Sequence, residues 1–218
     1  MKRVSKINTA WEKYYSSLHD LPRKLKTPVP LVVDELQTFR HHHVKSVLDL
    51  GCGAGRNCLF LAKEGFDLVS LDISRSALRM TNAQLHKERL ANVRLARGTM
   101  TNLPFDGDCF DAVISISVIH HAVKKDILKI ISEVCRILKK KGIFFTNVAS
   151  IEDPRCGEGE QVEENTFRIL EAFEEKRFEE LHHFSTRHEI LEMFACFNQL
   201  EFELLKDKPH YWRIMARK

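Results

Sequence analysis

Three glycines at alternating positions follow a short apolar run at residues 47–50, and a carboxylate ends the next apolar run. The glycines are Gly51, Gly53 and Gly55, and the carboxylate belongs to Asp72, about twenty residues further on. A buried strand that ends in glycines lets a ligand approach the backbone where no Cβ stands in the way. A carboxylate at the next strand end can accept hydrogen bonds from ribose hydroxyls. The pattern predicts a βα unit that binds a nucleoside-bearing cofactor.

The glycine spacing separates two classes of cofactor. Dinucleotide sites usually follow the pattern GxGxxG, which holds two phosphates at a helix N-terminus. In this chain Arg56 takes the place of the third dinucleotide glycine, and Asp49 precedes the first glycine. A carboxylate beside the turn suits a cationic ligand better than a pyrophosphate, because like charges repel. The spacing therefore disfavours an NAD-dependent oxidoreductase.

The block VLDLGCGAGR at 47–56, together with LDIS at 71–74, resembles the class I S-adenosylmethionine (SAM) methyltransferase family, in particular its type 11 and type 25 groups. The resemblance has specific motifs from about residue 46 to 149 and continues more loosely to the C-terminus. It implies SAM as the methyl donor and S-adenosylhomocysteine as the product. SAM carries a sulfonium and an ammonium and no phosphate, which agrees with acidic residues near the glycines.

The resemblance places the adenosine part of SAM at the ends of the second and third strands. It implies that Asp72 accepts hydrogen bonds from both ribose hydroxyls and that Ile73 packs on the adenine. Relatives commonly have aspartate where this chain has Thr99, and that carboxylate binds the adenine amino group. The Thr99 hydroxyl can accept the same bond as a weaker, neutral acceptor, and the Met100 amide can serve a ring nitrogen.

The methionine part of SAM is expected at the ends of the first and fourth strands. The resemblance implies that the backbone of Gly51, Cys52 and Gly53 passes close to it. Asp49 is expected to organise the turn or the ammonium through hydrogen bonds. The segment SISVIHH, which begins at Ser115, resembles the one in which related enzymes meet the methionine with backbone groups and the acceptor with side chains.

The acceptor side is expected to involve histidines and an aromatic residue. By the resemblance, His120 lies at the cofactor and His121 at the acceptor. Either could act as a general base, because imidazole titrates near neutral pH, and a structural role is the alternative. His183 is predicted to face the substrate, and Tyr15 either closes over SAM or docks on the core. No catalytic residue is assigned, since transfer from a sulfonium depends mainly on alignment.

Several histidines also raise the question of a metal. They are His182, His183 and His210, with the run at 41–43, and they occur without an HExxH motif or a fixed carboxylate pattern. Adjacent side chains in a strand point to opposite faces, so such pairs do not converge on one ion. We therefore predict no metal site.

Length and composition are typical of a soluble α/β domain with modest additions. The chain has 218 residues, of which 44% are hydrophobic and 29% are charged, with a net charge of +4. No apolar stretch approaches the ~20 residues of a membrane span, and the N-terminus lacks the apolar core of a signal peptide. The six cysteines form no CxxC pair, which is typical of reduced thiols. We expect a cytoplasmic protein that does not bind membranes.

From Ser46 onward, short apolar runs alternate with amphipathic segments, as in parallel βαβ units. The predicted fold class is a doubly wound α/β fold with a mainly parallel seven-stranded sheet and helices on both faces. The resemblance adds that the last strand is antiparallel. Strands are expected at 47–50, 67–71, 92–96, 110–116, 142–149, 197–205 and 210–217, and helices at 31–39, 55–64, 75–88, 124–138 and 186–194.

We expect one methyltransferase domain over residues 1–218, in four parts. These are an N-terminal helical cap (1–45), a SAM-binding core (46–149), an active-site cover (150–185), and a C-terminal helix with a strand hairpin (186–218). The cover is too long for an ordinary connection, and long segments of this kind are often functional. The helix that follows should begin at Ser185 or Thr186, with Glu189 completing a capping box.

Three functions remain open from the sequence. The leading one is methyl transfer from SAM to a small molecule by in-line displacement. A wobble-uridine tRNA methyltransferase is the second, because ISISVIHHA and EVCRILKKKG are similar to segments of the eukaryotic-type enzymes, although no concentrated basic stripe accompanies them. A noncatalytic SAM-binding partner subunit is the third. The motifs do not encode the acceptor, the oligomeric state or the pathway.

Overall fold

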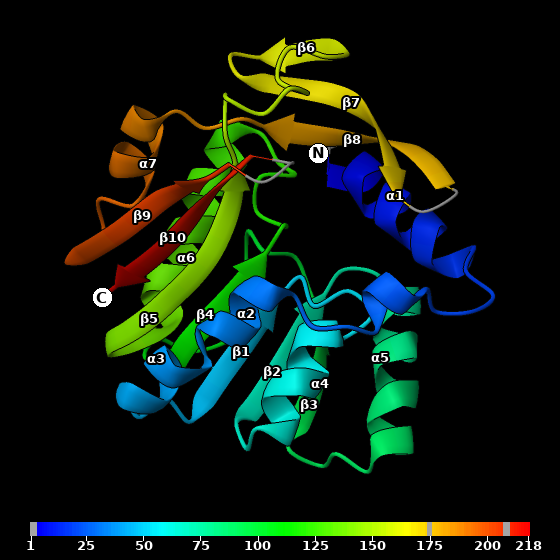
Figure 1. The fold of residues 1–218 in the computed structure, drawn as a ribbon, viewed down its shortest axis with the longest axis vertical. Coiled ribbons are helices and arrows are strands. Elements are labelled where there is room, and N and C mark those ends of the chain that lie inside the picture. Colours follow the sequence, from blue (N-terminus) through cyan, green and yellow to red (C-terminus); the bar gives the residue numbers. More distant parts are fainter. Residues whose placement is uncertain (1–3, 174–175, 207–209) are drawn as a thin grey trace.

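Seven strands form the central sheet of the computed structural model, which describes residues 4–173, 176–206 and 210–218 (Figure 1). They are β1 (Ser46–Leu50), β2 (Asp67–Asp72), β3 (Val93–Arg97), β4 (Phe110–Ile116), β5 (Leu138–Ala149), β9 (Gln199–Leu205) and β10 (Tyr211–Arg217). Their order in the sheet is β3-β2-β1-β4-β5-β10-β9. The first five strands are parallel, and β10 runs antiparallel to both of its neighbours. The predicted fold class is confirmed, including the antiparallel last strand.

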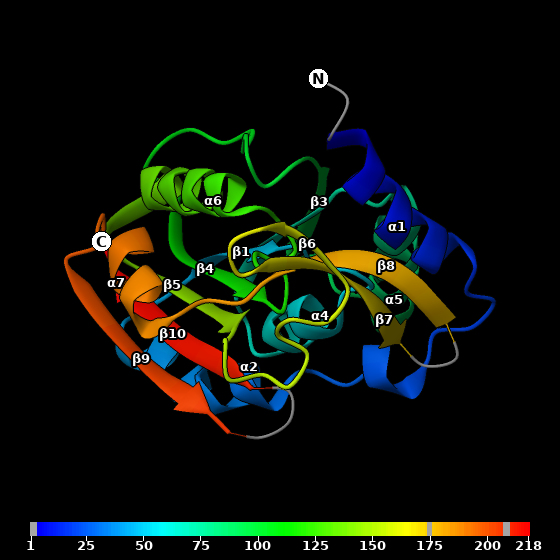
Figure 2. The same ribbon diagram turned by 90° about the horizontal axis from the view of Figure 1, so that it is seen from above.

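Helices cover both faces of this sheet (Figure 2). On one face lie α2 (Pro30–Asp34), α3 (Leu36–His41), α4 (Arg56–Lys63) and α5 (Arg75–Glu88), and on the other lie α6 (Lys124–Ile137) and α7 (Arg187–Met193). Strand side chains alternate between the faces, so Leu48 packs on the α6 side and its neighbour Val47 on the α4 side. Burial on both faces explains why the strands read as continuous apolar runs.

The segment before the sheet differs from the prediction in one respect. The sequence predicts one helix over 31–39, whereas the structure has two short helices, α2 and α3, that meet at Glu35. The Glu35 carboxylate is bound by the guanidinium of Arg213 on β10. This buried pair ties the helix junction to the sheet and leaves Arg213 engaged within the fold.

The N-terminal helix α1 (Val4–Ser16) lies against α5 at the carboxyl edge of the parallel strands (Figure 1). Glu12 accepts hydrogen bonds from the Ser74 hydroxyl (2.8 Å) and from the Ser76 amide and hydroxyl (3.1 and 2.7 Å). Burial raises the pKa of Glu12, but these hydrogen bonds outweigh it and lower the pKa overall. A carboxylate at the N-terminus of α5 also suits the helix dipole. A 3-10 turn, η1 (Arg23–Leu25), follows.

The predicted cover forms a second sheet above the carboxyl edge (Figure 1). Its antiparallel strands are β6 (Glu160–Glu163), β7 (Thr166–Phe173) and β8 (Lys176–His183), in that order. The sequence predicts no strand here because glutamates occupy inward-facing as well as outward-facing positions. They hide the alternation of apolar and polar residues that is typical of a strand with one buried face. Glu180, for example, is 2% exposed.

The capping box of α7 is confirmed: Thr186 accepts from the Glu189 amide (3.0 Å), and Glu189 accepts from the Thr186 amide (2.9 Å). The connection between β9 and β10 includes residues 207–209, which lie outside the described residues. None of the described helices combines the length and the apolar composition that a bilayer-spanning helix requires.

Candidate cofactor and acceptor site

The glycine turn lies at the carboxyl edge, where β1 passes into α4 and the strand order reverses between β1 and β4. This switch point is the usual ligand position in open α/β sheets. Gly51 and Gly53 have φ values of 77° and 55°, in the left-handed region that glycine adopts readily. A Cβ on Gly51 would collide with the side chain of Val118, and one on Gly53 would collide with the hydroxyl of Tyr15. The turn therefore runs beneath the segment after β4 and beneath α1.

Asp72 ends β2 beside this turn and is 8% exposed. Its Oδ2 accepts a hydrogen bond from the Gly53 amide (2.8 Å), and its Oδ1 accepts one from the Ser74 amide (2.8 Å). Burial raises the pKa of Asp72 in spite of these bonds. Each carboxylate oxygen keeps a second lone pair, so the group can still accept a hydrogen bond from a ribose hydroxyl.

Asp49 lies behind the turn, in β1, and is 2% exposed. Its Oδ2 has no hydrogen-bond partner among the described residues. Burial, and then the charge of Asp72, raises the pKa of Asp49 to about 7. The charge of Arg56 offsets the cost of burying this carboxylate only in part, and a cationic ligand would lower the remaining cost. The environment of Asp49 thus fits the ammonium or sulfonium of SAM.

The residues predicted to bind adenosine lie at neighbouring strand ends. Asp72 pairs with Arg97 in the parallel register of β2 and β3. Ile73 follows Asp72 directly, while Thr99 and Met100 come just after β3, and these three residues are partly buried. The structure therefore brings Ile73, Thr99 and Met100 to the same part of the carboxyl edge as Asp72.

Two other predicted residues support the turn from within the fold. The Ser115 hydroxyl donates to the carbonyl of Leu50 (2.9 Å), directly before Gly51. The amide of Cys52 donates to the carbonyl of Leu71 (3.1 Å), which joins the turn to β2. Both side chains are buried. The bond to Leu50 makes Ser115 a positioning residue for the turn.

Helix α1 covers the turn with aromatic side chains. Tyr15 is 7% exposed and lies with its hydroxyl against Gly53. Burial, and then the charge of Asp72, raises the pKa of Tyr15. Trp11, one turn earlier, packs edge-on against His121 at 5.5 Å between ring centroids. The predicted aromatic residue thus lies at the turn, and α1 also reaches the histidines beyond it.

Three imidazoles meet above the turn. His120 and His121 follow β4, and His182 comes from β8. Their ring centroids are separated by 4.3 Å (120–121), 4.4 Å (121–182) and 5.2 Å (120–182). Burial, with the neighbouring imidazoles, holds the pKa of His120 and of His121 well below the usual range. Both rings are therefore neutral near pH 7.

The structure does not bring the side chain of His183 to this group, and its role toward a substrate stays a prediction. Because neighbours in a strand point to opposite faces, His182 faces the cluster and His183 faces away. The Nδ1 of His183 is 2.8 Å from the Thr166 hydroxyl, and its Nε2 is 3.7 Å from Glu189. His183 thus connects β8 to β7 and α7.

Carboxylates lie beside these imidazoles, and sequence reasoning missed them. Strand alternation puts Phe178, Glu180 and His182 on one face of β8. Burial raises the pKa of Glu180 to about 8. Glu171, on β7, lies 2.9 Å from His182 and 2.7 Å from the guanidinium of Arg155. No local signal revealed this face, because Glu179 and Glu180 occupy outward and inward positions of β8.

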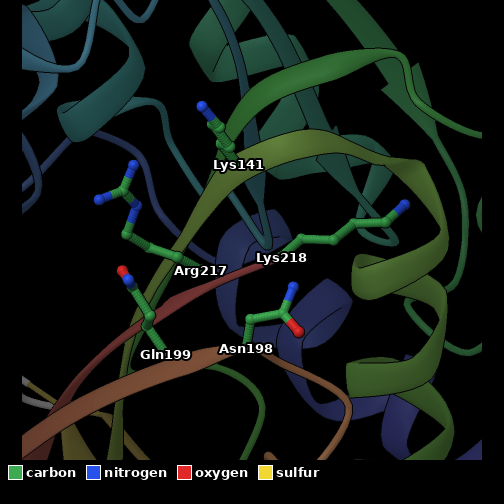
Figure 3. A pocket seen from close by; sticks show the side chains of 5 residues that line it. All are labelled: Lys141, Asn198, Gln199, Arg217 and Lys218. Atoms are coloured by element: carbon green, nitrogen blue, oxygen red, sulfur yellow. The ribbon is translucent and has the colours of Figure 1, made fainter.

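A separate cationic hollow lies at the opposite edge of the central sheet (Figure 3). It encloses about 390 Å³ and is lined by Lys141, Asn198, Gln199, Arg217 and Lys218. Arg217 pairs with Ile143, which in turn pairs with Ala112 near the start of β4, so the hollow lies at the amino ends of the parallel strands. It is therefore distant from the glycine turn.

Comparison with known proteins finds a match to one family model and to several methyltransferases. Residues 47–142 match the family model described as "Methyltransferase domain". The chain is 32% identical over 99 residues to the uncharacterized methyltransferase YcgJ of Bacillus subtilis. The aligned residues make up 45% of this chain and 38% of YcgJ. The chain is also 32% identical over 113 residues to the glycine/sarcosine N-methyltransferase of Parasynechococcus marenigrum, covering 50% and 40%. The chain thus spans less than half the length of these two relatives.

Solved structures share the fold. The crystal structure of a SAM-dependent methyltransferase from Methanosarcina mazei superposes with a TM-score of 0.70 at 20% sequence identity. The match covers 88% of this chain and 98% of that one. The similarity therefore extends beyond the residues of the family model and includes most of the architecture described above.

Proposed function

We propose that this chain, which matches the methyltransferase-domain model over residues 47–142, is a class I S-adenosylmethionine-dependent methyltransferase that transfers the methyl group of SAM to a small-molecule acceptor. The observation that carries the proposal is the pair of buried carboxylates at the glycine turn. Asp49 offers an unpartnered oxygen where a cation would bind, and Asp72 offers free lone pairs where ribose would bind.

When bound, SAM would supply an electrophilic methyl group on a sulfonium. The acceptor atom forms a bond to the methyl carbon while the carbon–sulfur bond breaks, and that electron pair stays on sulfur to give S-adenosylhomocysteine. The acceptor then releases a proton to a base or to water. The residues of this chain contribute by holding both reactants in line, since alignment alone lowers much of the barrier. Asp72 and the turn at 51–53 would fix the donor.

The acceptor side favours a small molecule because it is enclosed. Helix α1 and strand β8 pack together over the cluster, and His120 and His182 are at most 1% exposed. The neutral imidazole of His120 or of His121 can take a proton from the acceptor. The cationic hollow of Figure 3 would suit a nucleic-acid backbone, but it lies at the opposite end of strands roughly 20 Å long. Phosphates held there would not direct a base to the histidines.

Transfer from methyl-labelled SAM tests the proposal. The purified protein is incubated with labelled SAM and either a small-molecule metabolite extract or unmodified tRNA. We expect label in the small-molecule fraction, and its loss in Asp72→Ala. Label in the tRNA alone would refute the small-molecule acceptor. SAM binding without transfer to either fraction would favour a noncatalytic SAM-binding subunit.

A further inference from the structure

We propose that His120, His121 and His182 form a binding site for a divalent transition-metal ion, with Zn²⁺ as the best-matched ion. The proposal goes beyond methyl transfer and differs from the expectation of no metal. That expectation rested on the lack of an HExxH or carboxylate pattern and on adjacent histidines pointing to opposite faces of a strand. The fold adds His182, from a strand about sixty residues further along the chain, to the pair that follows β4.

The first argument is convergence. Each of the three histidines offers one ring nitrogen, and these nitrogens lie within 4.8 Å of one another. A tetrahedral Zn²⁺ site with bonds of about 2.0–2.1 Å needs nitrogens about 3.3 Å apart. Movements of about 1–2 Å therefore bring the three imidazoles onto one ion, a range that side-chain rotation covers.

The second argument is the lack of other partners. Both ring nitrogens of His120 and the Nδ1 of His182 are buried without a hydrogen bond of ordinary geometry among the described residues, whereas the Nε2 of His182 lies 2.9 Å from Glu171. The carbonyl of Asn147 is near enough to influence His120 but does not form such a bond. A buried polar atom without a partner costs about 1–3 kcal/mol and is rare in folded proteins. A bound ion would give one nitrogen of each ring a partner.

The third argument is the surrounding shell. Histidines that bind metals usually contact a carboxylate or a carbonyl through the other ring nitrogen, which orients the ring. The Nδ1 of His121 is 3.1 Å from the Leu181 carbonyl. The Nε2 of His182 is 2.9 Å from Oε1 of Glu171, which Arg155 holds at 2.7 Å. Two of the three rings thus already have the partner that a metal site requires.

The donor set indicates the kind of ion. Neutral imidazoles favour Zn²⁺, Cu²⁺, Ni²⁺ and Fe²⁺, whereas Mg²⁺ and Ca²⁺ prefer oxygen. The nearby carboxylates, Glu171 and Glu180, lie on the inner face of the cover and would offset the charge of the ion. Three protein ligands leave a coordination position open, as in catalytic zinc sites. An acceptor could bind there through oxygen, nitrogen or sulfur, a role that rests on the proposed function.

Metal titration of tag-free protein tests the site. Co²⁺ is the spectroscopic probe, because its visible absorption reports coordination by the protein, and Zn²⁺ is measured by calorimetry and by elemental analysis after dialysis. We expect one equivalent of Zn²⁺, displacement of Co²⁺ by Zn²⁺, and no competition by Mg²⁺. His182→Ala should weaken binding at least about a hundredfold, and Glu171→Gln about 10–100-fold.

His188→Ala is the matched control, since the His188 side chain is 81% exposed and lies on α7. It should leave the Zn²⁺ affinity unchanged. Equal Zn²⁺ binding by wild type and His182→Ala, or an equal loss in His188→Ala, would overturn the metal proposal. Thermal unfolding and SAM calorimetry on the same samples keep the two proposals separate. A folded wild type that binds SAM but not Zn²⁺ refutes the metal site alone, and failure to bind SAM refutes the proposed function.

Discussion

Asp49 should make SAM binding depend on pH near neutrality. In the free protein its pKa is raised to about 7, so the carboxyl is mostly protonated at pH 6 and mostly ionised at pH 7.5. A cationic ligand favours the ionised form and lowers this pKa. Binding below pH 7 must therefore release a proton, and the affinity should rise with pH. If the pKa in the complex lies well below 6, linkage gives an increase of about eightfold between pH 6 and 7.5.

Calorimetry measures both the affinity for SAM and the number of protons that binding releases. Titrations in two buffers with different ionisation enthalpies should show close to one proton released at pH 6 and about 0.2 at pH 7.5. The measurements stop at pH 7.5 because the amino group of SAM begins to lose its proton above that pH. Amino groups of this kind, α-amino groups, have a pKa of about 8. Asp49→Asn keeps the shape and removes the ionisation, so its affinity should be nearly independent of pH in this window. The same pH slope in wild type and Asp49→Asn would refute the reasoning.

Three further substitutions test separate parts of the structure. Asp72→Ala should weaken SAM binding by about 1–3 kcal/mol through lost charge-assisted hydrogen bonds, and unchanged calorimetric affinity in a folded variant would place the ribose elsewhere. Glu180 has a folded pKa of about 8, above its unfolded value of 4.5, so the cost of ionising it in the folded state appears as pH rises from about 4.5 to 8. Glu180→Gln should therefore raise the unfolding free energy by on the order of 4 kcal/mol at pH 8 and by little at pH 4, as measured by urea titration. An equal gain at both pH values would show that ionisation is not its cause. Thr186→Ala should cost about 1 kcal/mol of unfolding free energy through loss of the α7 cap, which the same urea titrations would detect, and no change would contradict the role of the capping box.

The core could be predicted from sequence because its signals are local. Continuous apolar runs such as 47–50 identify buried parallel strands, and the glycines after them identify the turn. Thr186 and Glu189 stand at the spacing of a capping box, and the structure has that box. In each case the residues that determine the element are within a few positions of one another.

The acceptor side could not be predicted in the same way because its determinants are distant in sequence. Whether His182 or His183 faces the site depends on the register of β8, and a shift of one residue exchanges the two. The buried Glu180 gave the segment a polar appearance that masked its strand pattern. The break between α2 and α3 occurs at Glu35, whose partner Arg213 is near the end of the chain. Long-range contacts of this kind leave no local pattern.

A crystal structure of the protein with S-adenosylhomocysteine tests the central claim most directly. The account predicts one bound molecule at the carboxyl edge, with its ribose hydroxyls within hydrogen-bond distance of Asp72 and its amino-acid part against the turn at 51–53. A ligand in the cationic hollow beside Lys141, or no bound ligand at saturating concentration, would contradict it.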